Sequence, residues 1–306
     1  MAQKSVKQKK EKVLVTGSSG FIASTLVPAF IKAGYSVTGV DRLDCTLIRE
    51  QKGFTFIKKD IDDLDTLAGF DYVVHLAFAT NIPKSILDPI GTTYNNLDLG
   101  VKMLELGKQA GVKKFLYPST ASLYGNQPLP WKEDMQVYPT EPYSLQKYAM
   151  ERFCRYYANN GLPTVILRLF QVFGENQRND TALYKFYQCR REGKPIPITQ
   201  TTAQAGFHSA KRDFIYTGDI AEAFIMAMES SDVGKGEIIN LCSGYNYTIR
   251  EIAELISERI EFIPKRGFEL DEHLGDASKA LKLLGWKART DIKDWMKKYV
   301  LSVPKA

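Results

Sequence analysis

The sequence predicts an α/β fold with a doubly wound parallel sheet and a smaller C-terminal lobe interleaved with it. Two observations predict this fold. Short β-branched apolar runs alternate with longer segments of helical periodicity, and a glycine-containing turn joins the first run to the first helix. The 306 residues, 44% of them apolar, suffice for one large core or for a core with a second lobe.

The elements follow one another in a regular order through the first half of the chain. Parallel strands need crossover helices, so this alternation predicts right-handed βαβ units. The predicted strands are 13–17, 36–41, 54–58, 72–77, 114–118 and 163–169, and the predicted helices are 21–33, closed by Gly34, 92–110 and 143–160.

The regular alternation of strands and helices ends after Gly174, where a polar stretch with few clear strands begins. We expect helices at 219–228, 248–256 and 278–284 and short strands at 237–241 and 261–263. These pieces are expected to interleave with the first domain, because no linker separates them. The predicted domains are a disordered basic tail (1–12), a nucleotide-binding domain (13–174, with later segments returning to it) and mainly a substrate-binding lobe (175–306).

Composition excludes several classes of protein. The formal charge of +6 comes mostly from the lysine-rich tail, and no aromatic or structural motif accompanies it, so we expect no nucleic-acid partner. No stretch approaches the roughly 18 apolar residues of a spanning helix, and the first residues are polar, which predicts a cytoplasmic protein without a membrane partner. The four cysteines are scattered, so neither a metal site nor a disulfide framework is expected.

A glycine turn predicts a dinucleotide site. Gly17, Gly20 and Ala23 form G-x-x-G-x-x-A between the first strand and its helix, where backbone amides can face a pyrophosphate. Asp41 ends the second strand about twenty residues later, where a carboxylate can accept hydrogen bonds from a ribose. This favours NAD, although Arg42 beside it leaves NADP open. Asp60 and Ile61 follow the third strand and are expected to border the adenine.

Tyr143 and Lys147 lie one helical turn apart and therefore share a helix face. An ammonium there can lower the phenol pKa from about 10 towards neutrality, which a tyrosine acting as a base requires. The pair by itself is common on helix surfaces, so its meaning depends on the motifs around it.

Taken in order and spacing, these motifs resemble the extended short-chain dehydrogenase/reductase family, in particular nucleotide-sugar epimerases of the UDP-glucose 4-epimerase type. The resemblance runs from Val13 almost to Trp295. The matching segments are Thr16-Gly-Ser-Ser-Gly-Phe-Ile-Ala23, Asp41, Asp60-Ile61, His75-Leu-Ala77, Asn96, Ser119-Thr-Ala-Ser-Leu-Tyr-Gly125, Tyr143-Ser-Leu-Gln-Lys147, Arg212-Asp-Phe214 and Asp276-Ala-Ser-Lys-Ala280.

The resemblance implies an isomerase of carbohydrate metabolism that inverts C4 of a nucleotide-diphosphate sugar through a 4-keto intermediate and regenerates NAD in each cycle. It implies that Tyr143 is the acid and base, that Thr120 bonds the reacting sugar oxygen, and that Lys147 also holds the nicotinamide ribose. The implied cofactor residues are Gly17, Ser19, Gly20, Phe21, Ile22, Asp41, Asp60, Ile61, Leu76, Ala77, Asn96, Tyr143 and Lys147. It also implies a homodimer, formed through the helices at 92–110 and 143–160.

The substrate side departs from the family pattern. Arg212 and Arg266 resemble the two arginines that clamp the diphosphate. Gln171 stands where an asparagine is usual, and His273 stands where a size-gating residue is found. The loop over 199–211 is longer than in the family, so a UDP-hexose is only the default substrate.

Other activities stay open. Dehydratases of this family carry Asp-Glu after the catalytic threonine, and decarboxylases a glutamate two residues after it, whereas this chain has Ala121 and Ser122. This favours an epimerase. A 4-keto reductase or dehydrogenase would use the same three residues. A non-catalytic NAD-sensing regulator is expected to lack the Tyr143 and Lys147 pair.

Overall fold

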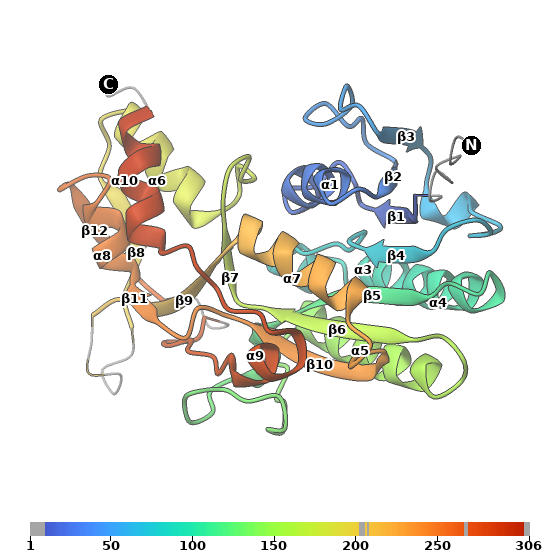
Figure 1. Cartoon of the computed structure of the whole chain (residues 1–306). Helices are drawn as coiled ribbons and strands as arrows, with labels where there is room; N and C mark the ends of the chain where they lie inside the picture. The colour runs from blue at the N-terminus through green and yellow to red at the C-terminus, as the bar shows by residue number, and fades with distance from the viewer. Residues whose placement is uncertain (1–9, 202–205, 207, 266–268, 303–306) are drawn as a thin grey trace.

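A seven-stranded parallel sheet forms the centre of the molecule, as the sequence predicts (Figure 1). The computed structural model describes residues 10–201, 206, 208–265 and 269–302. Every neighbouring pair of strands in this sheet is parallel. In spatial order, the strands are β10 (Lys235–Leu241), β6 (Thr164–Leu169), β5 (Lys114–Thr120), β4 (Tyr72–His75), β1 (Lys12–Thr16), β2 (Ser36–Asp41) and β3 (Phe54–Lys58).

The strand order reverses between β1 and β4. From β1 the chain adds β2 and β3 on one side, and it then returns to place β4, β5 and β6 on the other side. In such sheets, ligands bind in the crevice at the carboxyl ends of the strands that flank the reversal. The fold therefore places the expected site beyond Thr16 and His75, the last residues of β1 and β4.

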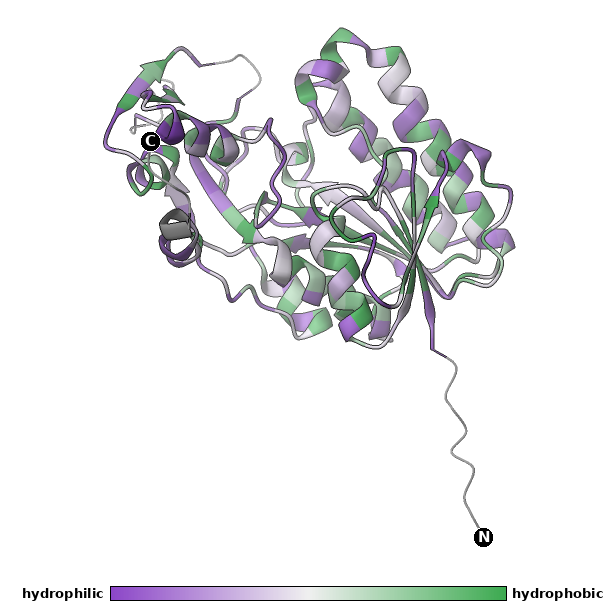
Figure 2. Cartoon of the chain, turned by 90° about the horizontal axis from the view of Figure 1, so that it is seen from above, coloured by the Kyte–Doolittle hydropathy of each residue, from purple (hydrophilic) through white to green (hydrophobic). Residues whose placement is uncertain are grey.

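Helices lie on both sides of the sheet (Figure 2), and each layer closes a separate apolar core. The helices are α1 (Ala23–Lys32), α7 (Thr217–Glu229) and α9 (Ser278–Leu284) in one layer and α4 (Leu99–Gln109) and α5 (Pro142–Ala158) in the other. Phe30 of α1 packs in one buried cluster with Phe224 of α7. Met103 of α4 and Met150 of α5 belong to the other cluster.

The segment ahead of α4 differs from the single helix predicted over 92–110. It begins earlier and is broken into α2 (Ile82–Leu87), α3 (Pro89–Thr93) and the π-helical turn η2 (Tyr94–Asp98). The side chain of Asn81 caps α2 by accepting a hydrogen bond from Lys84 N at 2.9 Å, and Asp88 caps α3 by accepting one from Gly91 N at 2.9 Å. Pro89 has no N–H with which to continue α2, so the chain starts a new helix there.

The C-terminal lobe interleaves with the main sheet, as predicted. β10, α7 and α9 come after residue 174 in the chain and yet belong to the sheet and its first helical layer. Six elements of the lobe were not predicted: helices α6 (Ala182–Arg191) and α10 (Ile292–Ser302) and strands β7 (Gln171–Phe173), β8 (Ile196–Thr199), β9 (Lys211–Tyr216) and β11 (Asn246–Thr248). The lobe elements are β7, β9 and β11 in one sheet, β8 and β12 (Ile260–Ile263) in another, and helices α6, α8 (Ile249–Glu254) and α10.

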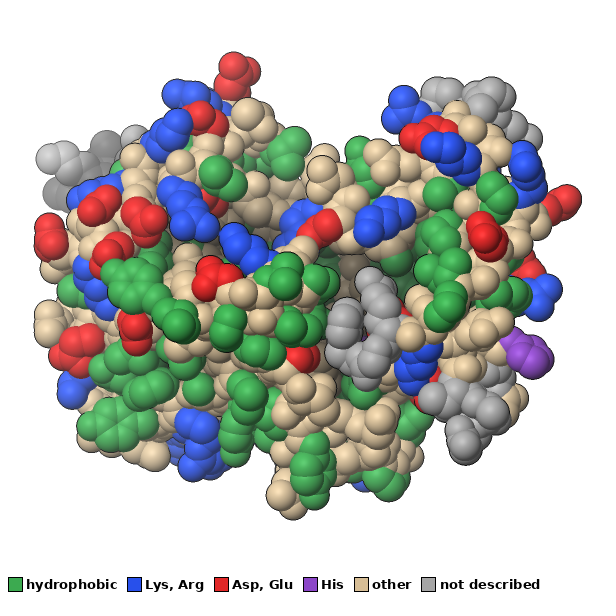
Figure 3. Space-filling view, turned by 180° about the vertical axis from the view of Figure 1, so that it is seen from behind, with side chains coloured by type: hydrophobic (Ala, Val, Ile, Leu, Met, Phe, Trp, Pro, Cys, Tyr) green, Lys and Arg blue, Asp and Glu red, His purple; other side chains and the backbone are tan. Residues whose placement is uncertain are grey.

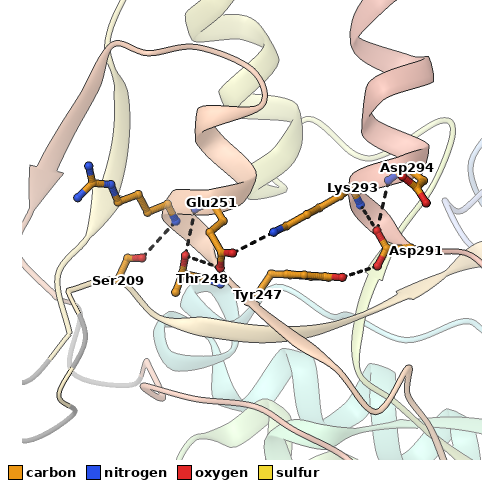
Figure 4. Close-up of polar contacts among 8 residues, drawn as sticks. Ser209, Tyr247, Thr248, Glu251, Asp291, Lys293 and Asp294 are labelled. Atoms are coloured by element: carbon orange, nitrogen blue, oxygen red, sulfur yellow. Dashed lines mark hydrogen bonds and ion pairs between the residues drawn. The ribbon is translucent and has the colours of Figure 1, made fainter.

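Polar contacts fix α8 to the start of α10 (Figure 4). The Thr248 hydroxyl accepts a hydrogen bond from Glu251 N at 3.0 Å, and Thr248 N donates to the Glu251 carboxylate at 2.8 Å. Lys293 Nζ of α10 donates to the other Glu251 oxygen at 2.9 Å, and the Tyr247 hydroxyl donates to Asp291. Capping and ion pairing thus add to the apolar contacts that hold the lobe together.

Candidate active site

Two clefts lie at the carboxyl edge of the main sheet, and a third adjoins one of them in the C-terminal lobe. The Tyr143 cleft has a volume of about 430 Å³, the Asp41 cleft about 260 Å³ and the Arg212 cleft about 360 Å³. Phe78 lines both the Tyr143 cleft and the Asp41 cleft, and Gln171 lines both the Tyr143 cleft and the Arg212 cleft. The Tyr143 cleft therefore borders both of the others.

The predicted glycine turn lies where the Tyr143 and Asp41 clefts meet. A Cβ at Gly17 would stand 2.7 Å from Ala77 N, and its φ of +68° is one that glycine adopts without strain. A Cβ at Gly20 would stand 3.1 Å from Gly17 O. Phe21 and Ile22, just ahead of α1, line the Tyr143 cleft. The turn therefore exposes main chain at the amino end of a helix, a place that suits an anion.

Asp41 is held in the Asp41 cleft by main-chain donors. Ser19 N donates to Asp41 Oδ2 at 3.0 Å, and Leu43 N donates to Asp41 Oδ1 at 2.9 Å. Ser19 contributes its amide to this contact, and its hydroxyl donates to Leu43 O. The glycine turn and the end of β2 are thus joined through one carboxylate whose orientation is fixed before any ligand binds.

The remaining predicted cofactor residues fall into two groups. Those that line the Asp41 cleft are Asp60, Ile61, Leu76 and Ala77. Asn96 is buried away from the lining: its Oδ1 accepts from Ala79 N at 2.7 Å, and its Nδ2 donates to Gln146 Oε1 at 2.7 Å. Asn96 therefore acts on the cleft through the loop after β4, which it holds in place.

Thr120, Tyr143 and Lys147 meet in the Tyr143 cleft. Thr120 is the last residue of β5, whereas the other two lie one turn apart on α5. Glu141 starts this helix, because both of its carboxylate oxygens accept from Ser144 N at 3.1 Å and a proline suited to the first helical position follows it. The sequence thus fixes where α5 begins and which side chains it presents to β5.

Burial dominates the protonation of this pair. It raises the pKa of Tyr143 to about 12, and a hydrogen bond with Thr120 acts in the opposite direction. It lowers the pKa of Lys147 to about 7, while Glu151 raises it. The lowered phenol pKa that the sequence predicts is absent, because desolvation outweighs the neighbouring groups. Both shifts favour uncharged side chains, so tyrosine chemistry here depends on keeping the Lys147 charge.

Sequence reasoning missed several side chains that line the Tyr143 cleft, among them Phe78, Ser122 and Arg178. The hydroxyls of Ser122 and Thr120 share a hydrogen bond of 3.0 Å, and Arg178 forms a two-bond ion pair with Asp180 at 2.9 Å. Phe78 and Ser122 directly follow the carboxyl ends of strands, a position that could have indicated them. Arg178 lies in the polar stretch after Gly174, where no sequence pattern singles it out.

On the substrate side, Arg212 is half-buried in the wall of the Arg212 cleft. Its guanidinium donates to Lys211 O and Leu270 O, each at 2.8 Å, which fixes its plane. Burial lowers the pKa of Arg212 to about 10, so the side chain keeps its charge at neutral pH. Its predicted companion, Arg266, lies outside the described residues.

His273 and Gln171 lie at the end of the Tyr143 cleft that faces the lobe. The His273 ring packs on Trp131, with ring centroids 5.1 Å apart. Burial and the charge of Arg212 lower the pKa of His273 well below its usual value, so the imidazole is neutral. Of the predicted long loop, residues 202–205 and 207 lie outside the described residues.

Comparisons with known proteins agree with this geometry. A model of the NAD dependent epimerase/dehydratase family matches residues 13–242. The UDP-glucuronate 4-epimerase of Thermodesulfobacterium geofontis is 32% identical over 94% of each chain. The structure of the Bacillus cereus UDP-glucuronic acid 4-epimerase with UDP-glucuronic acid and NAD is 29% identical, with a TM-score of 0.87 over 96% of this chain and 100% of that chain.

A second solved structure is similar to the same degree. The UDP-N-acetylglucosamine 4-epimerase of Methanobrevibacter ruminantium, in complex with UDP-N-acetylmuramic acid, is 30% identical, with a TM-score of 0.86 over 96% of this chain and 98% of that chain. The matched residues include all seven strands of the main sheet, the glycine turn and the Tyr143 and Lys147 pair. The predicted doubly wound α/β fold, of the Rossmann type, and the NAD cofactor are confirmed, and the chain belongs to the NAD dependent epimerase/dehydratase family.

Proposed function

We propose that this protein is an NAD-dependent 4-epimerase of nucleotide-diphosphate sugars. One observation carries the proposal: the cleft that holds Thr120, Tyr143 and Lys147 borders the Asp41 cleft and also the Arg212 cleft. A dinucleotide and a nucleotide-linked sugar can therefore lie end to end with the reacting carbon at Tyr143. The similarity to UDP-sugar 4-epimerases supports C4 as that carbon and a UDP-hexose as the default substrate.

The Asp41 cleft fits NAD. The space at Gly17, which a Cβ would fill, leaves main chain free to approach a pyrophosphate. The Asp41 carboxylate can accept hydrogen bonds from both hydroxyls of a ribose, whereas the phosphate of NADP would meet its negative charge. When bound, NAD supplies a reversible acceptor for the hydride that leaves the sugar carbon.

Tyr143 serves as both base and acid in this proposal. Thr120 bonds the C4 oxygen of the sugar, and Tyr143 takes the proton from that oxygen as the alcohol becomes a ketone. The 4-keto sugar turns over in the cleft, and Tyr143 returns the proton when the ketone is reduced on its other face. Lys147, anchored by donation to Pro118 O at 2.7 Å, supplies the positive charge that favours the phenolate and orients the cofactor ribose.

The lining of the Tyr143 cleft supports epimerisation over elimination or decarboxylation. Among the described residues that line it, none is Asp or Glu, and the two positions after Thr120 are Ala121 and Ser122. A carboxylate that could abstract a second proton is therefore absent from this lining. A 4-keto reductase would use the same three residues and is separated from an epimerase by its net consumption of reduced cofactor.

The Arg212 cleft is the proposed nucleotide site. Apolar side chains of Phe186, Phe214 and Ile249 line it and can contact a base, while the charged guanidinium of Arg212 suits a diphosphate. Gln171, shared with the Tyr143 cleft, lies between the two and is placed to contact the sugar end. Arg266 and His273 stay predictions for the diphosphate and for sugar size.

The proposal includes a homodimer that forms through α4 and α5. Apolar side chains are exposed on α5 and on the helices ahead of α4. Figure 3, the view from behind, shows apolar side chains gathered on the half of the molecule that carries these helices. A self-complementary apolar patch of this kind is typical of a twofold interface. The exposed residues are Leu87, Ile90, Tyr94, Leu145, Phe153 and Tyr156.

The proposal also places the enzyme in the cytoplasm. All four cysteines are free thiols, and three of them are buried, as is usual in a reducing compartment. In the described part of the chain, no helix combines the length and the apolar character that crossing a bilayer demands.

A substrate panel tests the proposed function. Purified protein is incubated with UDP-, GDP-, CDP- and dTDP-sugars without added reductant, and the configuration at C4 is followed by NMR alongside absorbance of NADH. The proposal predicts interconversion of two C4 epimers with no net NADH. Stoichiometric NADH, a released 4-keto product or silence across the panel would each contradict it.

A further inference from the structure

An aromatic enclosure surrounds the buried end of Lys147. Its Nζ lies 3.7 Å from the centroid of the Phe78 ring and 4.7 Å from that of the Tyr117 ring. The Phe78 ring also meets Tyr143, with centroids 6.0 Å apart and ring planes at 80°. One ring therefore touches both members of the proposed catalytic pair.

Glu151 raises the pKa of Lys147, but it shares its negative charge with a second cation. The carboxylate of Glu151 is occupied by Arg168, which donates to its two oxygens at 2.9 and 2.7 Å, and burial keeps His75 neutral. In the described part of the chain, the titratable and charged groups around Lys147 are His75 of β4, Tyr117 of β5, Arg168 of β6, and Tyr143, Glu151 and Cys154 of α5. The direct contacts of Nζ include Pro118 O and the faces of the two rings.

The face of an aromatic ring attracts a cation, and the attraction strengthens where water is excluded. Lys147 is buried, and the Phe78 ring lies within the distance at which this interaction is strong. We propose that Phe78 is a positioning residue of the reaction, which together with Tyr117 keeps the Lys147 ammonium charged and directed at the catalytic cleft. The inference rests on the proposed function, because that function gives Lys147 its part in the reaction.

The position of Phe78 fits a role in positioning Lys147 better than a role in packing the core. It is half-buried, stands on the loop after β4, and lines both the Tyr143 cleft and the Asp41 cleft. Phe70 provides a contrast, because it packs against the same apolar cluster beyond the other end of β4 and faces neither cleft. A ring needed only for packing has no reason to lie over an ammonium group.

The test measures the titration of Lys147 itself in the full chain. Carbon-13 labelled lysine is followed by NMR against pH, with the Lys147 signal identified by its loss in Lys147→Arg. Phe78→Leu is expected to lower the pKa of Lys147 by about half a unit to one and a half units, because the ring face is lost. Phe70→Leu, the matched control, is expected to leave it unchanged.

A fluorinated series separates the ring face from packing. Replacing Phe78 by phenylalanines with one, two and three ring fluorines weakens the ring face stepwise at nearly constant shape, and the pKa of Lys147 is expected to fall with each step. The proposal is overturned if Phe78→Leu leaves the titration unchanged, or if it moves the titration while the fluorinated series does not. No sugar nucleotide enters this measurement, so its outcome is independent of whether the substrate panel supports an epimerase.

Discussion

The hydroxyl of Tyr143 is the group on which the proposed chemistry depends most. Tyr143→Phe removes the proton carrier and keeps the ring that meets Phe78, so we expect the epimerisation rate to fall about 10²- to 10⁴-fold. The rate is measured by NMR of the sugar C4 configuration. Bound NAD, measured in the same preparations, is expected to be unchanged. Retention of more than about a tenth of the rate would show that another group moves the proton.

Single residues at strand ends were the most predictable part of the site. Gly17 and Asp41 could be assigned because they end predicted parallel strands, whose carboxyl ends lie at one edge of the sheet, whereas the role of Thr120 was implied by the family resemblance. Asn96 shows what the spacing of residues in the sequence does not reveal. Its position was recognised, but its side-chain amide forms hydrogen bonds with the main chain of the loop after β4. Which way a side chain points depends on partners far away in the sequence, such as Gln146.

At the scale of elements, Lys114 joins β5 to the end of α7. It is buried, and its Nζ donates to the carbonyl oxygens of Ala227, Met228 and Ser230 at 2.9, 3.2 and 2.7 Å. Lys114→Met leaves these oxygens without their donor, so we expect the free energy of unfolding to drop by about 1–3 kcal/mol in urea titrations.

Its neighbour Lys113 provides the matched control for this change. Lys113 makes exposed ion pairs with Glu11 and Asp71, and Lys113→Met is expected to cost less than about 1 kcal/mol. Equal losses of stability in the two variants would mean that the contacts of Lys114 with the end of α7 contribute nothing specific.

The elements that the sequence predicted are those with long apolar runs or sustained periodicity. The strands of the main sheet belong to this group, because most of them are buried on both faces. Helix α6 was missed although Leu183, Phe186 and Tyr187 have helical spacing and Thr181 caps it. A ten-residue helix among polar residues gives only one clear repeat of its pattern, which is too short to stand out.

At the scale of the whole molecule, the exposed apolar side chains of α5 predict association. Phe153→Glu places a charge in the proposed interface and is expected to yield monomers at micromolar concentration, measured by light scattering. Lys282→Glu puts the same residue on α9, in the opposite helical layer, and is expected to leave the dimer intact. A monomeric unaltered protein would contradict the proposed interface.

The interleaving of the two lobes could be predicted, whereas the internal arrangement of the C-terminal lobe could not. The absence of a linker indicated that later segments return to the first domain, and β10 does pair with β6. Within the lobe, contacts such as Lys293 with Glu251 join residues far apart in the chain, and nothing in the local sequence indicates such pairs.

In the proposed cycle, one site oxidises the sugar and then reduces it at the same carbon. A UDP-hexose carrying deuterium at C4 tests this claim directly, because the proposed cycle takes the label from that carbon and returns it there. We predict that both epimers keep deuterium at C4 in ordinary water, with no net NADH, as measured by mass spectrometry and NMR. Loss of the label to solvent, or its accumulation in released reduced cofactor, would rule out this cycle.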